Sequence, residues 1–285
     1  MQLRHILAAT DESDAGRQAV QTAFELASRA SARVTVLRVI ATEASRRLVR
    51  AGSGGTDNGY DETACSYLRR WLEAGVLAPS EASMVELAVA AGIPGVEICR
   101  FAEDAGADLV VLGRKRHSPM MRLLLGDTAD AVARRSRVPC LFVPPGSGEV
   151  RQVLAALDGS DRGLNVLIEA CDFAQATQTP LRTVTVERRP ADEPLHIVDD
   201  LPVARSSTLR GKVHEVLQRK SMENAQLAIR RGEVLERVLA EVQETGADVL
   251  AIGYHRGGPP GVIEAGSTAR RLAHAAPCAV LTIPL

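Results

Sequence analysis

The chain has 285 residues, 46% of them apolar, which is enough to bury a substantial core. Its 34 Lys and Arg nearly balance its 35 Asp and Glu, and this balance argues against a general electrostatic affinity for nucleic acid or anionic membranes. No run approaches the ~20 apolar residues needed to cross a bilayer, and the first residues lack the features of a signal peptide, so we expect a cytoplasmic protein.

The spacing of apolar residues predicts strands alternating with helices along the whole chain. In the first half, strands are predicted at residues 4–9, 33–40, 84–90, 108–112 and 140–143, and helices at 14–30, 61–74, 94–105 and after Gly126. In the second half, strands are predicted at 153–157, 181–186, 226–230, 249–252 and 279–283, and helices at 162–176, 209–225, 234–244 and 268–275. Residues 187–207, which hold three prolines, are predicted to form an exposed loop.

This alternation indicates an α/β fold with doubly wound parallel sheets, because parallel neighbours need crossover helices on both faces. The chain also contains one unit twice. HILAATDESD at residues 5–14 matches QVLAALDGSD at 152–161, and LLGDTADAVARRS at 124–136 matches EAGSTARRLAHAA at 264–276. We therefore predict two tandem Rossmann-like domains, residues 1–147 and 148–285, joined at a turn-rich segment.

The five cysteines are scattered and never form a C-x-x-C pair. We expect them to be reduced, partly buried thiols, as is usual in the cytosol. They are Cys65, Cys99, Cys140, Cys171 and Cys278.

Polar residues follow the first strand of each copy, at the sheet edge where parallel folds bind ligands. Asp11 and Asp158 each open a D-x-S-D turn before a helix. Either carboxylate could cap the helix through its free backbone N–H groups, or could contact a base or ribose in the crevice. The turn pattern alone leaves both interpretations open.

A second polar segment, Gly266-Ser267-Thr268, precedes the last helix. The glycine lets a backbone approach closely, and the hydroxyls and unpaired helix N–H groups together suit an anion. The same tripeptide can simply cap a helix, and judged by itself it is more typical of a cap.

Taken together, these motifs resemble the universal stress protein family across nearly the whole chain. The family pattern has a first-strand Asp, then G-x2-G-x9-G-[ST] before the last helix. The resemblance implies an adenine-nucleotide-binding α/β fold, in which the Asp and the end of the second strand hold adenosine and the glycine loop holds the phosphates. It also implies pairing of the two final strands, residues 140–143 and 279–283, which gives a pseudo-dimer within one chain, and two such chains could join as a homodimer.

The resemblance assigns a nucleotide site to the second copy and a degenerate site to the first. The second-copy residues are Asp158, Val186, Gly253, Arg256, Gly266, Ser267 and Thr268. The first-copy residues are Asp11, Val39, Gly113, Arg116, Gly126 and Asp127.

Three residues depart from the family pattern. Arg116 and Arg256 replace the second glycine of the motif, where a guanidinium would either obstruct phosphates or clamp them. Asp127 stands where Ser or Thr belongs, and its carboxylate would satisfy the helix N–H groups and repel a triphosphate. We therefore expect the first copy to have lost ATP binding and the second to retain it.

No catalytic residue and no metal-ligand set is assigned, because the common hydrolase, metalloprotease and P-loop signatures are missing from the sequence. His255 is the one histidine placed to transfer a proton, although a surface histidine is the commoner outcome. The cluster Arg114 to His117 is predicted to be a solvated loop. The leading expectation is a stress-response protein that binds ATP mainly in its second domain. The alternatives are a regulatory or scaffold protein without nucleotide, and a weak ATPase.

Overall fold

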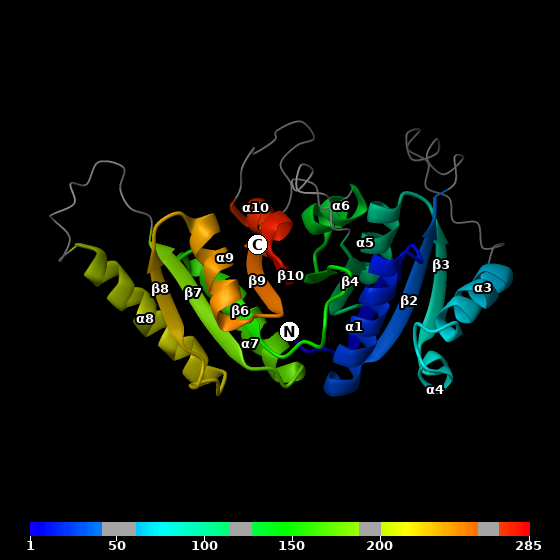
Figure 1. The fold of residues 1–285 in the computed structure, drawn as a ribbon, viewed down its shortest axis with the longest axis horizontal. Coiled ribbons are helices and arrows are strands. Elements are labelled where there is room, and N and C mark those ends of the chain that lie inside the picture. Colours follow the sequence, from blue (N-terminus) through cyan, green and yellow to red (C-terminus); the bar gives the residue numbers. More distant parts are fainter. Residues whose placement is uncertain (42–60, 115–126, 188–200, 256–267) are drawn as a thin grey trace.

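A single ten-stranded sheet runs through the molecule, with strand order β3-β2-β1-β4-β5-β10-β9-β6-β7-β8 (Figure 1). The computed structural model describes residues 1–41, 61–114, 127–187, 201–255 and 268–285. Neighbouring strands are parallel, except that β5 and β10 pair antiparallel at the centre. Each half of the chain thus contributes five adjacent strands, and the two halves meet at β5 and β10.

The ten strands follow the predicted apolar runs. They are β1 (His5–Thr10), β2 (Arg33–Ile40), β3 (Glu86–Ala91), β4 (Leu109–Gly113), β5 (Cys140–Val143), β6 (Val153–Leu157), β7 (Leu181–Glu187), β8 (Leu227–Arg231), β9 (Val249–Tyr254) and β10 (Ala279–Pro284). The described helices are α1 (Asp14–Ala30), α3 (Asp61–Glu73), α4 (Pro79–Ala82), α5 (Pro94–Asp104), α6 (Asp127–Arg135), α7 (Asp161–Ala176), α8 (Leu201–Arg219), α9 (Val234–Thr245) and α10 (Thr268–Ala275).

The central pairing joins the two halves into one sheet. Leu281 faces Leu141 in the β5–β10 register, and Val280 faces Phe142. This is the pairing of final strands that the family resemblance implies. Because backbone hydrogen bonds cross the boundary between the copies, each half covers the strand edge that the other would otherwise expose.

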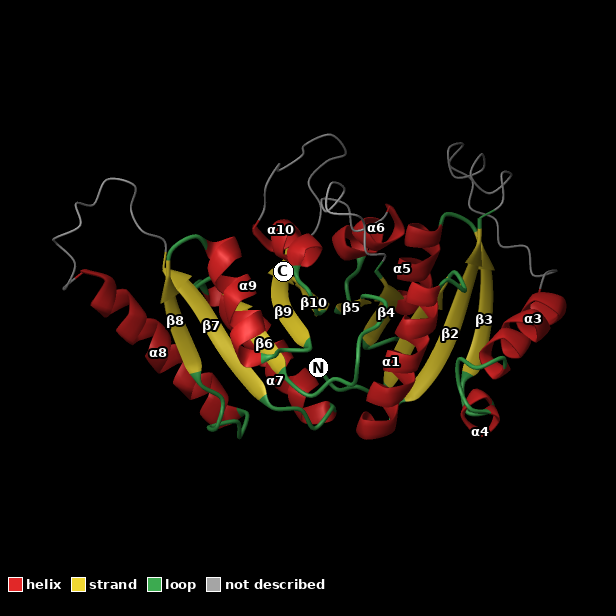
Figure 2. Ribbon diagram, viewed as in Figure 1, coloured by secondary structure: helices red, strands yellow, loops and turns green. Residues whose placement is uncertain are grey.

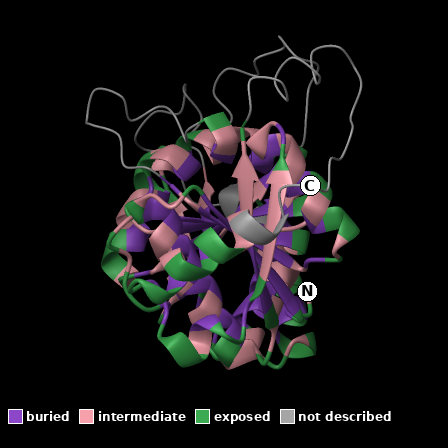
Figure 3. Cartoon of the chain, turned by 90° about the vertical axis from the view of Figure 1, so that its right-hand side faces the viewer, coloured by how far each residue is buried: buried purple, intermediate pink, exposed green. Residues whose placement is uncertain are grey.

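Helices cover both faces of the sheet, as a parallel sheet requires (Figure 2). Helices α1, α3, α7 and α8 contribute to the buried cluster on one face. Helices α5, α6, α9 and α10 contribute to the cluster on the other face. The inner strands lie in the buried interior between these layers, whereas the edge strands β3 and β8 are mostly of intermediate burial. Exposed residues concentrate on the outer sides of the helices (Figure 3).

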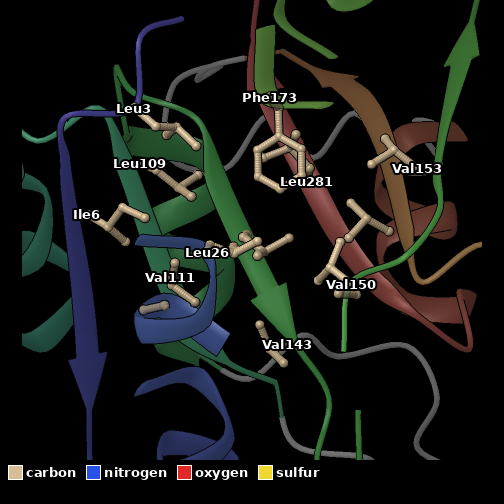
Figure 4. Close-up of a cluster of buried hydrophobic side chains, with 14 of the residues drawn as sticks. Leu3, Ile6, Leu26, Leu109, Val111, Val143, Val150, Val153, Phe173 and Leu281 are labelled. Carbon is tan, nitrogen blue, oxygen red and sulfur yellow. The ribbon is translucent and has the colours of Figure 1, made fainter. Parts of the chain in front are cut away.

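Both buried clusters contain residues from both halves of the chain. On the α1 and α7 face, Leu26, Val143, Phe173 and Leu281 belong to one cluster, and the close-up in Figure 4 shows their side chains together. Burial of this shared apolar surface holds the halves together in addition to the strand pairing.

The segment before the first strand of each half packs on the opposite half. Arg29 of α1 donates from Nη1 to the Val150 carbonyl at 2.6 Å, and the Val150 amide donates to Glu25 Oε1 at 3.2 Å. In the reciprocal contact, the Met1 ammonium pairs with Asp172 of α7. Because Asp172 occupies the repeat position of Glu25, the two contacts are related by the internal symmetry of the chain.

One predicted loop is wrong in part. Residues 201–207 were expected in an exposed loop, but they form the first turns of α8, which begins at Leu201. The other residues of that predicted loop, apart from Glu187 at the end of β7, lie outside the described residues. Pro202 does not prevent the helix, because proline is well tolerated in a first helical turn. Further along α8, Val213, Val216 and Leu217 are buried, which confirms the predicted apolar face.

A buried histidine in β1 makes folding sensitive to mild acid. His5 is 3% exposed, and its Nε2 lies 2.8 Å from Thr35 Oγ1. Burial lowers the pKa of His5 below its ordinary value of 6.5, and the nearby Arg33 charge lowers it further. Glu86 and Asp108 oppose these effects more weakly. The folded protein therefore keeps His5 neutral at a pH where the unfolded chain takes up a proton.

We expect the free energy of unfolding to fall as the pH drops from about 7.5 through the ordinary histidine pKa to about 5.5. The sign follows because the unfolded state binds more protons in this range. Urea unfolding of the wild type and His5→Gln at both pH values measures the effect, and the variant should lose part of the slope. An identical pH slope in the two proteins would contradict this assignment.

Candidate functional site

Two hollows lie at the carboxyl ends of the parallel strands, at equivalent positions in the two halves. The second-half hollow has a volume of about 480 Å³. Its lining residues are Ala156, Leu157, Asp158, Gly163, Val166, Val186, Val234, Val238, Ile252, Gly253, His255, Thr268, Ala269, Leu272 and Leu285. The first-half hollow has a volume of about 120 Å³ and is lined by the corresponding segments. Pockets that hold drug-sized ligands usually span about 300–1,000 Å³, so only the second-half hollow falls in that range.

The second-half hollow, called the β6 pocket below, is mainly aliphatic. Its walls come from the ends of β6, β7 and β9 and from helices α7, α9 and α10. Val186 contributes from β7, Val238 from α9 and Leu272 from α10. Apolar walls with a few polar groups at the rim suit a flat organic ring with a polar attachment.

Asp158 is the acidic group at the rim. It is exposed, and its Oδ1 accepts hydrogen bonds from the Ser160 amide at 2.9 Å and the Ser160 hydroxyl at 2.6 Å. Ser160 in turn is the N-cap of α7 and accepts from the Gly163 amide at 3.1 Å. Asp158 is therefore not the N-cap that the sequence offered as one interpretation. Since both bonds fall on Oδ1, Oδ2 can accept from a hydroxyl in the pocket.

Asp11 has the same local structure in the first half. Ser13 caps α1, and Asp11 Oδ1 accepts from the Ser13 amide at 3.1 Å and from its hydroxyl. The surroundings differ, however. Glu12 adopts φ 62° where the second half has Gly159, and its carboxylate pairs with Arg38 of β2. The first-half hollow, called the β1 pocket below, thus has an ion pair beside it that the β6 pocket lacks at the matching positions.

The predicted phosphate end of each site is described only in part. Thr268 begins α10 and lines the β6 pocket, while Arg256, Gly266 and Ser267 lie outside the described residues. In the first half, Asp127 begins α6, as predicted. Arg116 and Gly126 also lie outside the described residues.

The two strand-end glycines, Gly113 and Gly253, allow close packing. A β-carbon at Gly113 would lie 2.7 Å from the Gly16 nitrogen, so the first turn of α1 rests directly on the end of β4. At Gly253 a β-carbon would lie 2.5 Å from Leu285 Cδ1 and 2.9 Å from Val166 Cγ2. In the second half a flexible leucine side chain therefore occupies the place where the first half has helix backbone.

The structure brings together Asp158, Val186, Gly253 and Thr268 around the β6 pocket. It likewise brings Asp11, Val39 and Gly113 around the β1 pocket. Sequence reasoning missed the helix residues that form the walls of the β6 pocket, Val234, Val238 and Leu272. Their regular spacing on predicted helices marked them only as core-facing positions.

The prediction for Arg114 is also wrong. Arg114 was expected in a solvated loop, but it is 6% exposed and its guanidinium donates to backbone carbonyls of the second half. The other residues of that cluster lie outside the described residues. Tyr254 occupies the matching position of the second half and is also buried. Burial raises the pKa of Tyr254, and the Asp130 charge raises it further.

Comparison with known proteins agrees with this architecture. The sequence profile of the universal stress protein family matches residues 2–144 and again 149–284. Universal stress protein YxiE of Bacillus subtilis is 27% identical over 143 residues, covering 48% of this chain and 97% of that protein.

Two solved structures share the fold of the whole chain. A universal stress protein from Archaeoglobus fulgidus matches with a TM-score of 0.71 at 20% identity, covering 100% of this chain and 99% of that one. PA1789 of Pseudomonas aeruginosa, a protein of unknown function, matches with a TM-score of 0.59 at 14% identity, covering 99% and 92%. The chain belongs to the universal stress protein family and is a two-copy member of it. It is therefore a stress-response protein by family.

No described helix is long and apolar enough to span a membrane. The described residues also contain no group of three or more His, Cys, Asp or Glu side chains arranged to hold a metal ion. All five cysteines lie in the described part of the chain, and none of them is joined in a disulfide.

Proposed function

We propose that the protein binds one adenine nucleotide, ATP, in the β6 pocket, and that the β1 pocket has lost this ability. The observation that carries the proposal is the fourfold difference in volume between two pockets built from matching segments, about 480 Å³ against about 120 Å³. Family membership supports the choice of ligand class, because the residues that the family pattern assigns to adenosine line the larger pocket.

The base and ribose fit the chemistry of this pocket. Aliphatic side chains from β7, α9 and α10 would contact the faces of the base. Oδ2 of Asp158 would accept from a ribose hydroxyl, which is a common role for an acidic residue at this edge of a nucleotide-binding sheet.

The phosphates would lie at the start of α10. The amide groups of a first helical turn point outward, and the helix dipole favours negative charge there. Thr268, the first residue of α10, lines the pocket at this point. The family pattern assigns Gly266, Ser267 and Arg256 to this end of the site, and these three lie outside the described residues.

The first half would then serve a structural or regulatory role. Asp127 at the start of α6 already places a carboxylate where phosphate would bind. The small β1 pocket favours the same conclusion. We propose the cytoplasm as the compartment, because five cysteines without a disulfide are usual in a reducing environment.

A matched pair of variants tests the function. Asp158→Ala should weaken ATP binding about tenfold, because a hydrogen bond from a ribose hydroxyl to a charged group is lost. Asp11→Ala removes a carboxylate with the same local hydrogen bonds in the smaller pocket, and it should leave the affinity unchanged. Isothermal titration calorimetry of the full chain gives the affinity and stoichiometry, which should be one ATP per chain.

Three results would count against the proposal. They are wild-type protein that binds no ATP at millimolar concentration, a stoichiometry of two, or an equal loss of affinity in the two variants. Protein that binds no nucleotide yet retains a tight protein partner would support the scaffold alternative. Turnover of ATP that is lost in His255→Ala would support the weak ATPase.

A further inference from the structure

Arg114 connects the first domain to one helix of the second. It follows β4 of the first domain, and its buried guanidinium reaches the far end of α10. The carbonyls that accept from it are Ala273 at 2.7 Å and His274 at 3.3 Å from Nη1, and Ala276 at 2.7 Å and Cys278 at 3.0 Å from Nη2.

Two of these carbonyls, those of Ala273 and His274, belong to the last turn of α10, and the other two follow the end of the helix. The last carbonyls of a helix have no intrahelical N–H donor, and the helix dipole makes this end negative. A guanidinium offers several donors in a fixed planar arrangement, so one side chain can hold several carbonyls at once. Because a buried cation is costly without partners, these contacts also fix the position of Arg114 itself.

The other end of the same helix forms part of the β6 pocket. Thr268, Ala269 and Leu272 of α10 all line it. The helix has only eight residues, about 12 Å at ~1.5 Å per residue, and behaves as a short rigid rod. A shift of its C-terminal end therefore also moves the α10 residues that line the pocket.

The matching residues of the two halves make different contacts. The repeat position of Arg114 is Tyr254, which has a single hydroxyl in place of a guanidinium. Past the end of α6, the Ser136 hydroxyl donates to the Val138 carbonyl at 2.7 Å, within the first domain. Helix α6 instead receives Arg270 of α10, whose Nε lies 3.7 Å from Asp130 Oδ1. Of the two equivalent helices, the one whose C-terminal carbonyls accept from an arginine of the opposite domain is the one at the larger pocket.

We propose that Arg114 is a positioning residue for the nucleotide pocket of the second domain: by holding the C-terminal end of α10, it sets the place of the helix whose first turn lines that pocket. The identity of the ligand rests on the proposed function, but the positioning role does not. Because coupling between sites is reciprocal, a ligand in the pocket should also strengthen the contact between the domains.

Arg29 provides the matched control. It is another first-domain arginine, and it donates to the Val150 carbonyl at the start of the second half, but it lies on α1 and does not contact α10. Arg114→Met and Arg29→Met each remove a guanidinium that links the domains. Arg114→Lys is the milder variant in case Arg114→Met fails to fold.

The first measurement needs no ligand. Amide hydrogen exchange of the full chain, followed at peptides covering residues 268–275, should be about tenfold faster in Arg114→Met than in wild type, with a smaller change in Arg114→Lys. Arg29→Met should leave these amides unchanged. Exchange that is unaltered in both Arg114 variants, or altered equally by Arg29→Met, would overturn the positioning role.

The second measurement is ATP affinity by calorimetry, well below the unfolding temperature. Arg114→Met should weaken binding about fivefold or more, and Arg29→Met by less than twofold. Equal affinities in wild type and Arg114→Met would overturn the coupling to the pocket. If wild type binds no ATP while exchange in α10 still responds to Arg114, the proposed function fails and the positioning role stands.

Discussion

Phe173→Ala should lower the free energy of unfolding by about 3–5 kcal/mol, the usual range for an aromatic truncated in a close-packed core. Phe173 lies on α7 and is fully buried. Its ring lies beside Leu281 of the central strand β10 in Figure 4, in a cluster that includes Leu26 and Val143 of the first half. The cavity would therefore open where the two halves share their core.

The position of this cavity also leads to a prediction about the cooperativity of unfolding. Because both halves contribute to the cluster, the variant should still unfold in one transition, with a lower midpoint in urea. Circular dichroism and tryptophan fluorescence report different parts of the chain and should give the same midpoint. Met84→Ala truncates a side chain that is 73% exposed and should change stability by less than about 0.5 kcal/mol. A comparable loss in both variants would show that burial is not the cause.

Much of this fold could be predicted because its strands are buried on both faces. The apolar run at residues 249–252, for example, could be identified as a strand without information about the neighbouring strands of the sheet, and it forms β9. The internal repeat then fixed two copies of one unit, which the sheet order confirms. The start of α8 was missed because three prolines suggested a loop, although the proline at position 202 lies in the first turn of the helix.

Residues at the carboxyl ends of parallel strands could also be predicted to gather, because topology alone brings those ends to one edge. Asp158 and Val186 line one pocket for this reason. The burial of Arg114 could not be predicted, since its partners are about 160 residues away in sequence and its neighbours are basic. The one sequence signal for a special role of Arg114 was that the corresponding position of the second copy holds a different residue, Tyr254. The difference in pocket volume could not be predicted either, because it depends on side-chain packing that no local pattern encodes.

Gly113→Ala should destabilise the protein by about 3 kcal/mol, at the upper end of the usual cost of overpacking. The added methyl would lie 2.7 Å from the Gly16 nitrogen and closer still to the carbonyl group of Ala15. These are backbone atoms at the capped start of α1, so no rotamer change can relieve the contact, and α1 must move off β4. The midpoint of urea unfolding measures the loss.

Gly253→Ala is the control at the matching position of the second half. Its methyl would meet the side chains of Leu285 and Val166, which can move, and the cost should be about 1 kcal/mol. The same methyl narrows the β6 pocket, so this milder variant should be the one that weakens ATP binding. The two variants therefore separate an effect on stability from an effect on binding. Gly113→Ala should lower mainly the free energy of unfolding, and Gly253→Ala should lower mainly the affinity for ATP. Equal destabilisation by the two changes would mean that α1 and α7 approach the sheet in the same way, contrary to the packing described above.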